Sequence, residues 1–144
     1  MTGLPFLNTN LLLRHLTQDH PDLSPRATAL IRHIEVGELE VRTTDTVVFE
    51  TAYTLQRFYR VFRIQVRAIV MPILELRGIR LTGKHRYRRT FDLYVTITAL
   101  SFADCYHAAY MESAHLTDLI SFDRDMDRVS TIVRKEPDRE GRLV

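Results

Sequence analysis

Short apolar runs alternate with segments of helical periodicity along the whole chain. The pattern predicts strands at 4–8, 39–43, 79–81, 119–122 and 131–133. Apolar stripes with a helical period predict helices at 11–16, 25–36, 47–55, 64–76, 90–100 and 103–111, with one further turn at 124–128. Strands and helices that alternate in this way predict an α/β fold of three layers, α/β/α, because parallel strands are joined by right-handed crossover helices that cover both sheet faces.

Polar residues and glycine at the edges of these segments indicate where helices begin and end. Asn10 is expected to cap the first helix, and Ser24 the second, with Pro25 at its first helical position. Gly37 is expected to end that second helix. Ser101 is expected to cap the helix at 103–111.

Length and composition are those of one soluble domain with a substantial apolar core. The chain has 144 residues, of which 45% are hydrophobic and 26% charged. No apolar run approaches the ~20 residues that cross a bilayer, and the N-terminus lacks the pattern of a secretory signal. A lone cysteine, Cys105, cannot form an intramolecular disulfide and is expected to be a small buried residue. We therefore expect a single cytoplasmic domain over 1–144 with no membrane span and a polar C-terminal tail from 134 to 144.

The charge distribution is more informative than the net charge of +2. Half of all Lys and Arg lie between Arg57 and Arg89, where Glu75 is the lone acid. The aromatic residues interleaved with them are Phe58, Tyr59, Phe62 and Tyr87. Two interpretations stay open: a face that binds RNA phosphates, with Arg57, Arg60, Arg86 and Arg88 as candidate contacts, or solvated helix faces whose Phe and Tyr lie in the core.

Four oxygen-bearing side chains follow predicted strands or open the helices after them. These are Asn8, Glu50, Asp104 and Asp123. Each has a structural alternative, since Asp104 with Ser101 matches a capping box, Asp123 can cap the turn after it, and Glu50 suits a helix start. Taken together, carboxylates at corresponding strand ends meet at one rim of a parallel sheet, where a cation must offset their repulsion. The all-oxygen donor set favours Mg²⁺ or Mn²⁺.

Four segments resemble the motifs of PIN domains, in the family's order and over nearly the whole chain. They are FLNTNLLL at 6–13, VVFETAYTL at 47–55, FADCYHAA at 102–109 and ISFDRD at 120–125. The resemblance is closest to the stand-alone VapC-type toxin ribonucleases of toxin–antitoxin modules. It implies a PIN-like parallel sheet of about five strands and an Mg²⁺- or Mn²⁺-dependent endoribonuclease that cuts single-stranded or loop RNA. It also implies a homodimer and an antitoxin partner that blocks the site.

Residue by residue, the resemblance places Glu50, Asp104 and Asp123 on acids of the family's catalytic metal site. Asn10 falls on the polar residue that supports the first acid, and Ser121 on the hydroxyl residue before the last one. These roles are implied by the resemblance alone.

The chain departs from the family at Asn8, where the family has aspartate. An amide oxygen can still coordinate a metal, but the side chain has lost a negative charge and gained an NH₂ group that only donates. We therefore expect weakened metal affinity and weakened or abolished cleavage. The alternative is a catalytically inactive PIN-like module that binds RNA or an antitoxin. A third interpretation, a flavodoxin-like signalling domain with an acidic Mg²⁺ pocket, needs a lysine opposite the acids, and the chain has only Lys84 and Lys135.

Overall fold

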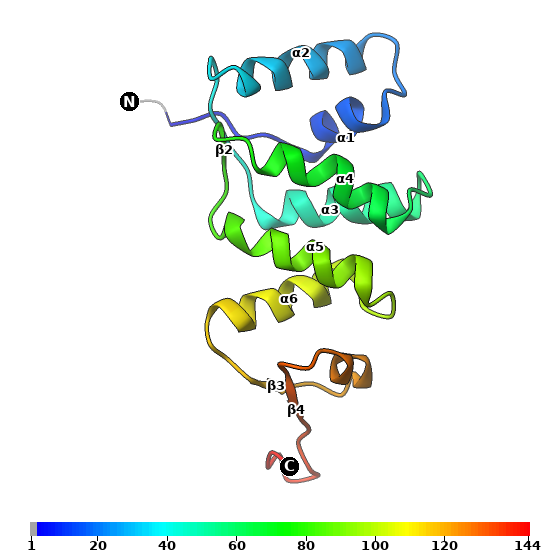
Figure 1. The fold of residues 1–144 in the computed structure, drawn as a ribbon, viewed down its shortest axis with the longest axis vertical. Helices are drawn as coiled ribbons and strands as arrows, with labels where there is room; N and C mark the ends of the chain where they lie inside the picture. The colour runs from blue at the N-terminus through cyan, green and yellow to red at the C-terminus, as the bar shows by residue number, and fades with distance from the viewer. Residues whose placement is uncertain (1–2) are drawn as a thin grey trace. The chain divides into compact units, whose positions relative to one another are not determined.

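A computed structural model describes residues 3–144 and shows a mixed α/β protein with six α-helices and short parallel strands (Figure 1). The predicted PIN-like α/β class is confirmed. The chain forms two compact units, one extending to Lys84 and the other running from His85 to Val144. Each unit is described in turn.

The first unit consists of four helices and two short strands. They are α1 (Thr9–Thr17), α2 (Leu23–Glu35), β1 (Val41–Arg42), α3 (Asp45–Arg57), α4 (Arg63–Leu74) and β2 (Ile79–Arg80). The strands pair in parallel, with Val41 opposite Ile79. The predicted strand at 4–8 is an extended segment beside β1, where Phe6 forms a parallel bridge with Arg42 and the Leu7 N–H donates to the Arg42 carbonyl at 2.7 Å.

The core of this unit lies between the strands and the helices that follow them. Its buried members are Leu7, Leu12, Ile31, Ile34, Val41, Val47, Ile73 and Ile79. Gly78 allows β2 to start close to this core, because a Cβ there would lie 2.8 Å from both the Leu39 carbonyl oxygen and the Ile34 Cγ2. Any other residue would push the strand away from its neighbour.

Two predicted helix starts in this unit are wrong by two residues. Asn8, rather than Asn10, caps α1, because its backbone is still extended (φ −93°, ψ 162°) and its side chain accepts a hydrogen bond from the Thr9 N–H at 2.9 Å. Helix α2 begins at Leu23 instead of Pro25. The ring Nδ1 of His20 accepts from the Leu23 N–H at 2.9 Å, so this early backbone donor already has a partner.

The predicted end of the second helix agrees with the structure, whereas the fourth helix ends two residues earlier than predicted. Gly37 follows α2 with a φ of 84°, the left-handed conformation that glycine adopts without steric cost. Helix α4 stops at Leu74 rather than at residue 76, two residues after Pro72, whose ring and missing N–H disfavour continuation of a helix.

The second unit contains two helices, a short 3-10 helix and two strands. A 3-10 turn, η1 (Lys84–Arg86), precedes α5 (Tyr87–Thr96), α6 (Phe102–Ser113), β3 (Asp118–Ile120), η2 (Arg124–Arg128) and β4 (Val133–Lys135). The two strands pair in parallel with Asp118 opposite Val133. Helices α5 and α6 lie side by side (Figure 1).

Several boundaries in this unit differ from the predicted ones. Helix α5 begins at Tyr87, three residues before the predicted start at residue 90. Helix α5 stops at Thr96, short of residue 100, because Ile97 leaves the helical region (φ −111°, ψ 88°). The last strand lies two residues later than 131–133. Thr131 instead donates to Glu112 at 2.9 Å, and pairing starts where the Val133 N–H reaches the Thr117 carbonyl at 2.8 Å.

Aromatic rings make most of the core between α5 and α6. Phe102 packs edge-on against Phe91 and Tyr94, with ring centroids 5.1 and 5.2 Å apart. Cys105 is fully buried in the same region, as the sequence predicted. Within residues 3–144, no helix combines the length and the apolar character that a bilayer crossing requires.

Candidate functional site

In the first unit, the structure brings two of the predicted site residues to neighbouring helices. Asn8 caps α1 at the carboxyl end of the first extended segment, and Glu50 lies in the second turn of α3. The residue after Asn8 connects them, since the Thr9 hydroxyl donates to the Glu50 carboxylate (Oε2) at 3.2 Å. Thr9 is only 6% exposed, whereas Asn8 and Glu50 are both exposed. A buried hydroxyl therefore orients a carboxylate that solvent can reach.

Thr9 is the functional residue that sequence reasoning missed in this unit. Its neighbours Asn8 and Asn10 were predicted as site residues because polar side chains that follow a strand are candidate ligands. A threonine between them is also common at the start of a helix, so its type alone predicts no functional role. The only available signal was a hydroxyl immediately after the candidate ligand. That signal identifies no partner, because the partner lies 41 residues further along the chain.

In the second unit, Asp104 lies at the capped start of a helix, and its role as a metal ligand stays a prediction. It lies in the first turn of α6, half-buried, and its N–H donates to the Ser101 hydroxyl oxygen at 3.1 Å. This confirms Ser101 as the N-cap of α6. The bond uses the backbone of Asp104 only, so the carboxylate remains available for another role.

Asp123 is held between a strand end and a short helix. Its N–H donates to the Ser121 hydroxyl oxygen at 3.0 Å, and its Oδ1 accepts from the Asp125 N–H at 2.9 Å, which makes Asp123 the N-cap of η2. Ser121 thus contacts Asp123 directly, at the position where the family resemblance places a supporting hydroxyl. The cap of η2 uses one carboxylate oxygen of Asp123, Oδ1.

Arg134 holds the segment around Asp123, and the sequence analysis had placed it in a polar tail. Its side chain is only 11% exposed and donates to the Ser121 carbonyl at 3.0 Å and to Asp127 at 2.9 and 3.3 Å. It also forms an ion pair with Glu136 at 3.1 Å. One guanidinium therefore connects β4, the end of β3 and η2 through its several donors.

The oxygen donors match a hard divalent cation in their chemistry. Asn8 and Glu50 belong to the first unit and Asp104 and Asp123 to the second, and all four offer oxygen atoms of the kind that Mg²⁺ and Mn²⁺ bind. Among residues 3–144, no three His, Cys, Asp or Glu side chains form a group that could hold a metal ion. The joint metal site predicted from the sequence therefore stays a prediction.

The basic residues proposed for RNA contact differ in their surroundings. Arg57 and Arg60 are exposed at the end of α3 and in the turn after it, and Arg88 is exposed on α5. Arg86 is engaged inside the second unit, where it donates to Tyr106 and Ser113 at 3.2 Å and lies 5.0 Å from the centre of the Tyr110 ring.

The interpretation that placed the interleaved aromatic residues in the core is wrong for three of them. Phe58, Tyr59 and Phe62 are exposed, and Tyr87 alone is buried. The apolar residues that fill the core at this point are Leu55 and Val66, so the turn between them presents its rings outward.

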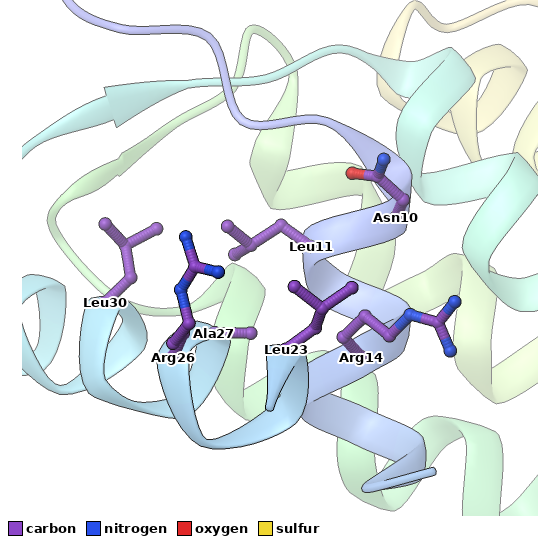
Figure 2. A pocket seen from close by; sticks show the side chains of 7 residues that line it. All are labelled: Asn10, Leu11, Arg14, Leu23, Arg26, Ala27 and Leu30. Atoms are coloured by element: carbon purple, nitrogen blue, oxygen red, sulfur yellow. The ribbon is translucent and has the colours of Figure 1, made fainter. Parts of the chain in front are cut away.

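A groove lies between α1 and α2 and has a volume of about 430 Å³. Figure 2 shows Asn10, Leu11 and Arg14 from α1 facing Leu23, Arg26, Ala27 and Leu30 from α2. Asn10, the predicted supporting residue for the first acid, is exposed and lines this groove.

Comparison with known proteins identifies the family. No curated protein matches the chain significantly. The PIN domain, whose members are generally nucleases and typically bind divalent metals, matches residues 6–132. The match includes Asn8, Glu50, Asp104 and Asp123 and covers most of the chain, so this protein belongs to the PIN domain family.

Proposed function

We propose that the chain is an Mg²⁺- or Mn²⁺-dependent endoribonuclease, the toxin of a toxin–antitoxin module, whose cleavage is weakened or abolished by Asn8. The contact between Thr9 and Glu50 carries the proposal, because it holds an exposed carboxylate beside the strand end where the metal ligand Asn8 is expected. Membership of a family of nucleases supports the reaction class. We treat both units as one domain, since the PIN match runs through both.

The oxygens of Asn8, Glu50, Asp104 and Asp123 would hold the ion. When bound, the ion supplies Lewis-acid activation of the scissile phosphodiester and lowers the pKa of a water molecule. The protein's own part is to hold the ligands: Thr9 orients Glu50, and Ser121 and Arg134 fix the backbone that carries Asp123. The amide of Asn8 is expected to bind the ion more weakly than the family's aspartate does, because it lacks the negative charge.

The partners and location follow from the same proposal. The substrate is single-stranded or loop RNA, and Arg57, Arg60, Arg86 and Arg88 are the candidate phosphate contacts. Arg86 is the least available of the four because other residues already engage it. An antitoxin, a homodimeric state and a cytoplasmic location complete the proposal and rest on the family resemblance and the sequence.

Manganese titration by calorimetry, with RNA cleavage assayed in parallel on this chain and on Asn8→Asp, tests the proposal. We expect Asn8→Asp to bind Mn²⁺ at least tenfold more tightly and to cut RNA, with little or no cleavage by the parent chain. If neither the parent chain nor Asn8→Asp binds Mn²⁺ or cuts RNA, the proposed nuclease activity is refuted.

The alternative is a PIN-like module that binds RNA or its antitoxin without cutting. It is favoured by the capping role of Asn8, since an amide oxygen that accepts from the Thr9 N–H serves the fold without any metal. Binding of RNA by both forms without cleavage by either would support this alternative.

A further inference from the structure

We propose that the turn between α3 and α4 is a stacking platform for the bases of single-stranded RNA, with Phe58 and Phe62 as the stacking rings and Arg57 and Arg60 as the phosphate contacts. The choice of RNA as the ligand rests on the proposed function, whereas the platform rests on the exposure, charge and backbone of the turn. The turn is at the right of the view in Figure 1, between the ends labelled α3 and α4.

The two phenyl rings are presented to solvent by a rigid backbone. Phe58 is 72% and Phe62 80% exposed, although neither ring has a polar group that prefers water. Phe58 ends α3 and its N–H donates to the Thr54 carbonyl at 2.9 Å, while the Phe62 carbonyl accepts from the Val66 N–H at 2.9 Å to start α4. The rings are therefore attached to two helix ends and not to a loose loop.

The charge around the rings has one sign. Between Glu50 and Glu75 the charged residues are Arg57, Arg60, Arg63 and Arg67, with no acid among them. Arg57 and Arg60 are exposed, and neither forms an ion pair recorded within the described part of the chain. Exposed arginines between exposed aromatic rings suit a polynucleotide, whose phosphates pair with guanidinium and whose unpaired bases stack on rings.

The backbone at Arg60 is strained, which argues against an accidental arrangement. Its φ is 57°, the left-handed region that glycine normally occupies at such a reversal and that costs a larger side chain energy. The Val61 N–H reaches back to the Leu55 carbonyl at 3.0 Å and closes the reversal. Arg60 therefore places a guanidinium at a position where glycine would be the easier choice, so the turn carries this charge at a conformational cost.

Tyr59 connects the platform to the segment that follows α1. Its hydroxyl donates to the Asp19 carboxylate at 2.8 Å, and Asp19 also accepts from Arg14 at 3.0 Å and Thr17 at 2.9 Å. These hydrogen bonds, that of Tyr59 first, lower the pKa of Asp19 to about 2. Asp19, the acid that contacts this turn, is thus engaged by Arg14, Thr17 and Tyr59 and forms no ion pair with Arg57 or Arg60.

Unpaired RNA suits this surface better than a duplex or a protein partner. Bases in a duplex are already stacked on one another and cannot cover the phenyl rings. A protein partner would have to bury arginines beside the rings and supply acids for them, whereas RNA brings phosphates at regular spacing.

The test is binding of a labelled, unstructured RNA of mixed sequence to the full chain, measured by fluorescence anisotropy in EDTA so that cleavage does not contribute. We expect Phe58→Ala and Phe62→Ala to weaken binding about 5- to 150-fold each, the range for loss of one stacked base. Val36→Ala removes another exposed apolar side chain, at the end of α2, and should leave binding unchanged.

Arg60→Gly distinguishes the effect of the guanidinium charge on RNA binding from any effect on the stability of the fold. Glycine relieves the left-handed strain, so thermal stability should not fall, while binding weakens and the salt dependence of binding loses a slope of about 0.7, the value for one phosphate contact on a single strand. Parent-like binding by Arg60→Gly together with both phenylalanine variants would overturn the platform.

The absence of tryptophan in the chain allows a direct test of stacking. Phe58→Trp introduces a single indole whose fluorescence should be quenched by single-stranded RNA, and Val36→Trp is the matched control. No quenching of Phe58→Trp, or equal competition by duplex RNA, would refute base stacking.

Three further outcomes distinguish this proposal from others. A change of oligomeric state in sedimentation of Phe58→Ala and Phe62→Ala, with RNA binding intact, would identify a protein interface and overturn the platform. If Phe58→Ala and Phe62→Ala, each introduced into the Asn8→Asp chain, do not change RNA cleavage, the platform is refuted and the proposed nuclease activity is supported. If RNA binds to the platform in EDTA and neither the parent chain nor Asn8→Asp cuts RNA, the platform is supported and the proposed nuclease activity is refuted.

Discussion

The hydrogen bond from Thr9 to Glu50 is the contact most open to a quantitative test. Thr9→Val keeps the β-branched shape and nearly the volume of the buried side chain and removes only the hydroxyl that donates at 3.2 Å. A hydrogen bond to a charged group contributes roughly 1.5–3 kcal/mol, but water can replace the lost donor at the exposed Glu50 carboxylate. We therefore expect Thr9→Val to lower the free energy of unfolding by about 0.5–1.5 kcal/mol, measured by urea denaturation.

The effect on metal binding should exceed the effect on stability. Groups that orient a metal ligand typically alter affinity about 10- to 100-fold when removed, and we expect the lower end because Glu50 is exposed. The measurement is Mn²⁺ calorimetry of Thr9→Val in the Asn8→Asp background, where affinity is high enough to follow. Thr9→Ser keeps the hydroxyl and should restore most of the affinity.

Thr51→Val is the matched control. Thr51 is fully buried in the same helix as Glu50, but its hydroxyl donates to the Val47 carbonyl at 2.7 Å and not to a candidate ligand. It should change stability by a comparable amount and leave Mn²⁺ affinity unchanged. Equal weakening of Mn²⁺ binding by Thr51→Val and Thr9→Val would refute the positioning role and assign the effect to general loss of stability.

Three further predictions concern contacts outside the Thr9 pair. The folded-state pKa of Asp19 is lowered to about 2 from 3.8, so its stabilising effect is present above pH 3.8 and is lost as the pH falls towards 2. Tyr59→Phe should therefore be less stable than the parent near neutral pH and approach it at pH 2, and a constant difference in thermal unfolding would contradict this. Arg89 lowers the pKa of Glu112 below its usual 4.5, so Glu112→Gln should cost about 1 kcal/mol above pH 4.5 and progressively less below it, by urea denaturation. Arg134→Met removes the bonds to Asp127 and to the Ser121 carbonyl and should lower the urea midpoint of unfolding, whereas an unchanged midpoint would mean that these bonds do not stabilise the fold.

Much of the candidate site could be predicted because its residues are marked by local sequence. Ser101 was recognised as a cap because its hydroxyl satisfies a helix-start donor three residues away, and the capping role considered for Asp123 is visible over two residues. Family membership was recognised in the same way, since the four PIN motifs are short contiguous segments. Whether Glu50, Asp104 and Asp123 share a metal ion stays a prediction.

The predictions that failed depend on atoms far apart in the chain. Asn8 and Asn10 are equally good caps by residue type, and the choice falls on Asn8 because backbone pairing with Arg42 ends at Leu7. Similarly, Phe58 and Phe62 read as core residues by hydrophobicity. In the structure both are exposed, and the residues of α3 and α4 that are fully buried near the turn are Leu55 and Val66.

By itself, the sequence determined the α/β class, most helix positions and the residues whose chemistry suits a metal nuclease. These properties follow from periodicity and from contacts within one turn of helix, which act over a few residues. Only the tertiary structure decided that Thr9 meets Glu50, that Arg134 belongs to the packed structure, and that two phenylalanines face solvent. Each of these depends on which distant segments pack together, because burial and long-range hydrogen bonds are properties of the assembled chain and not of any local segment.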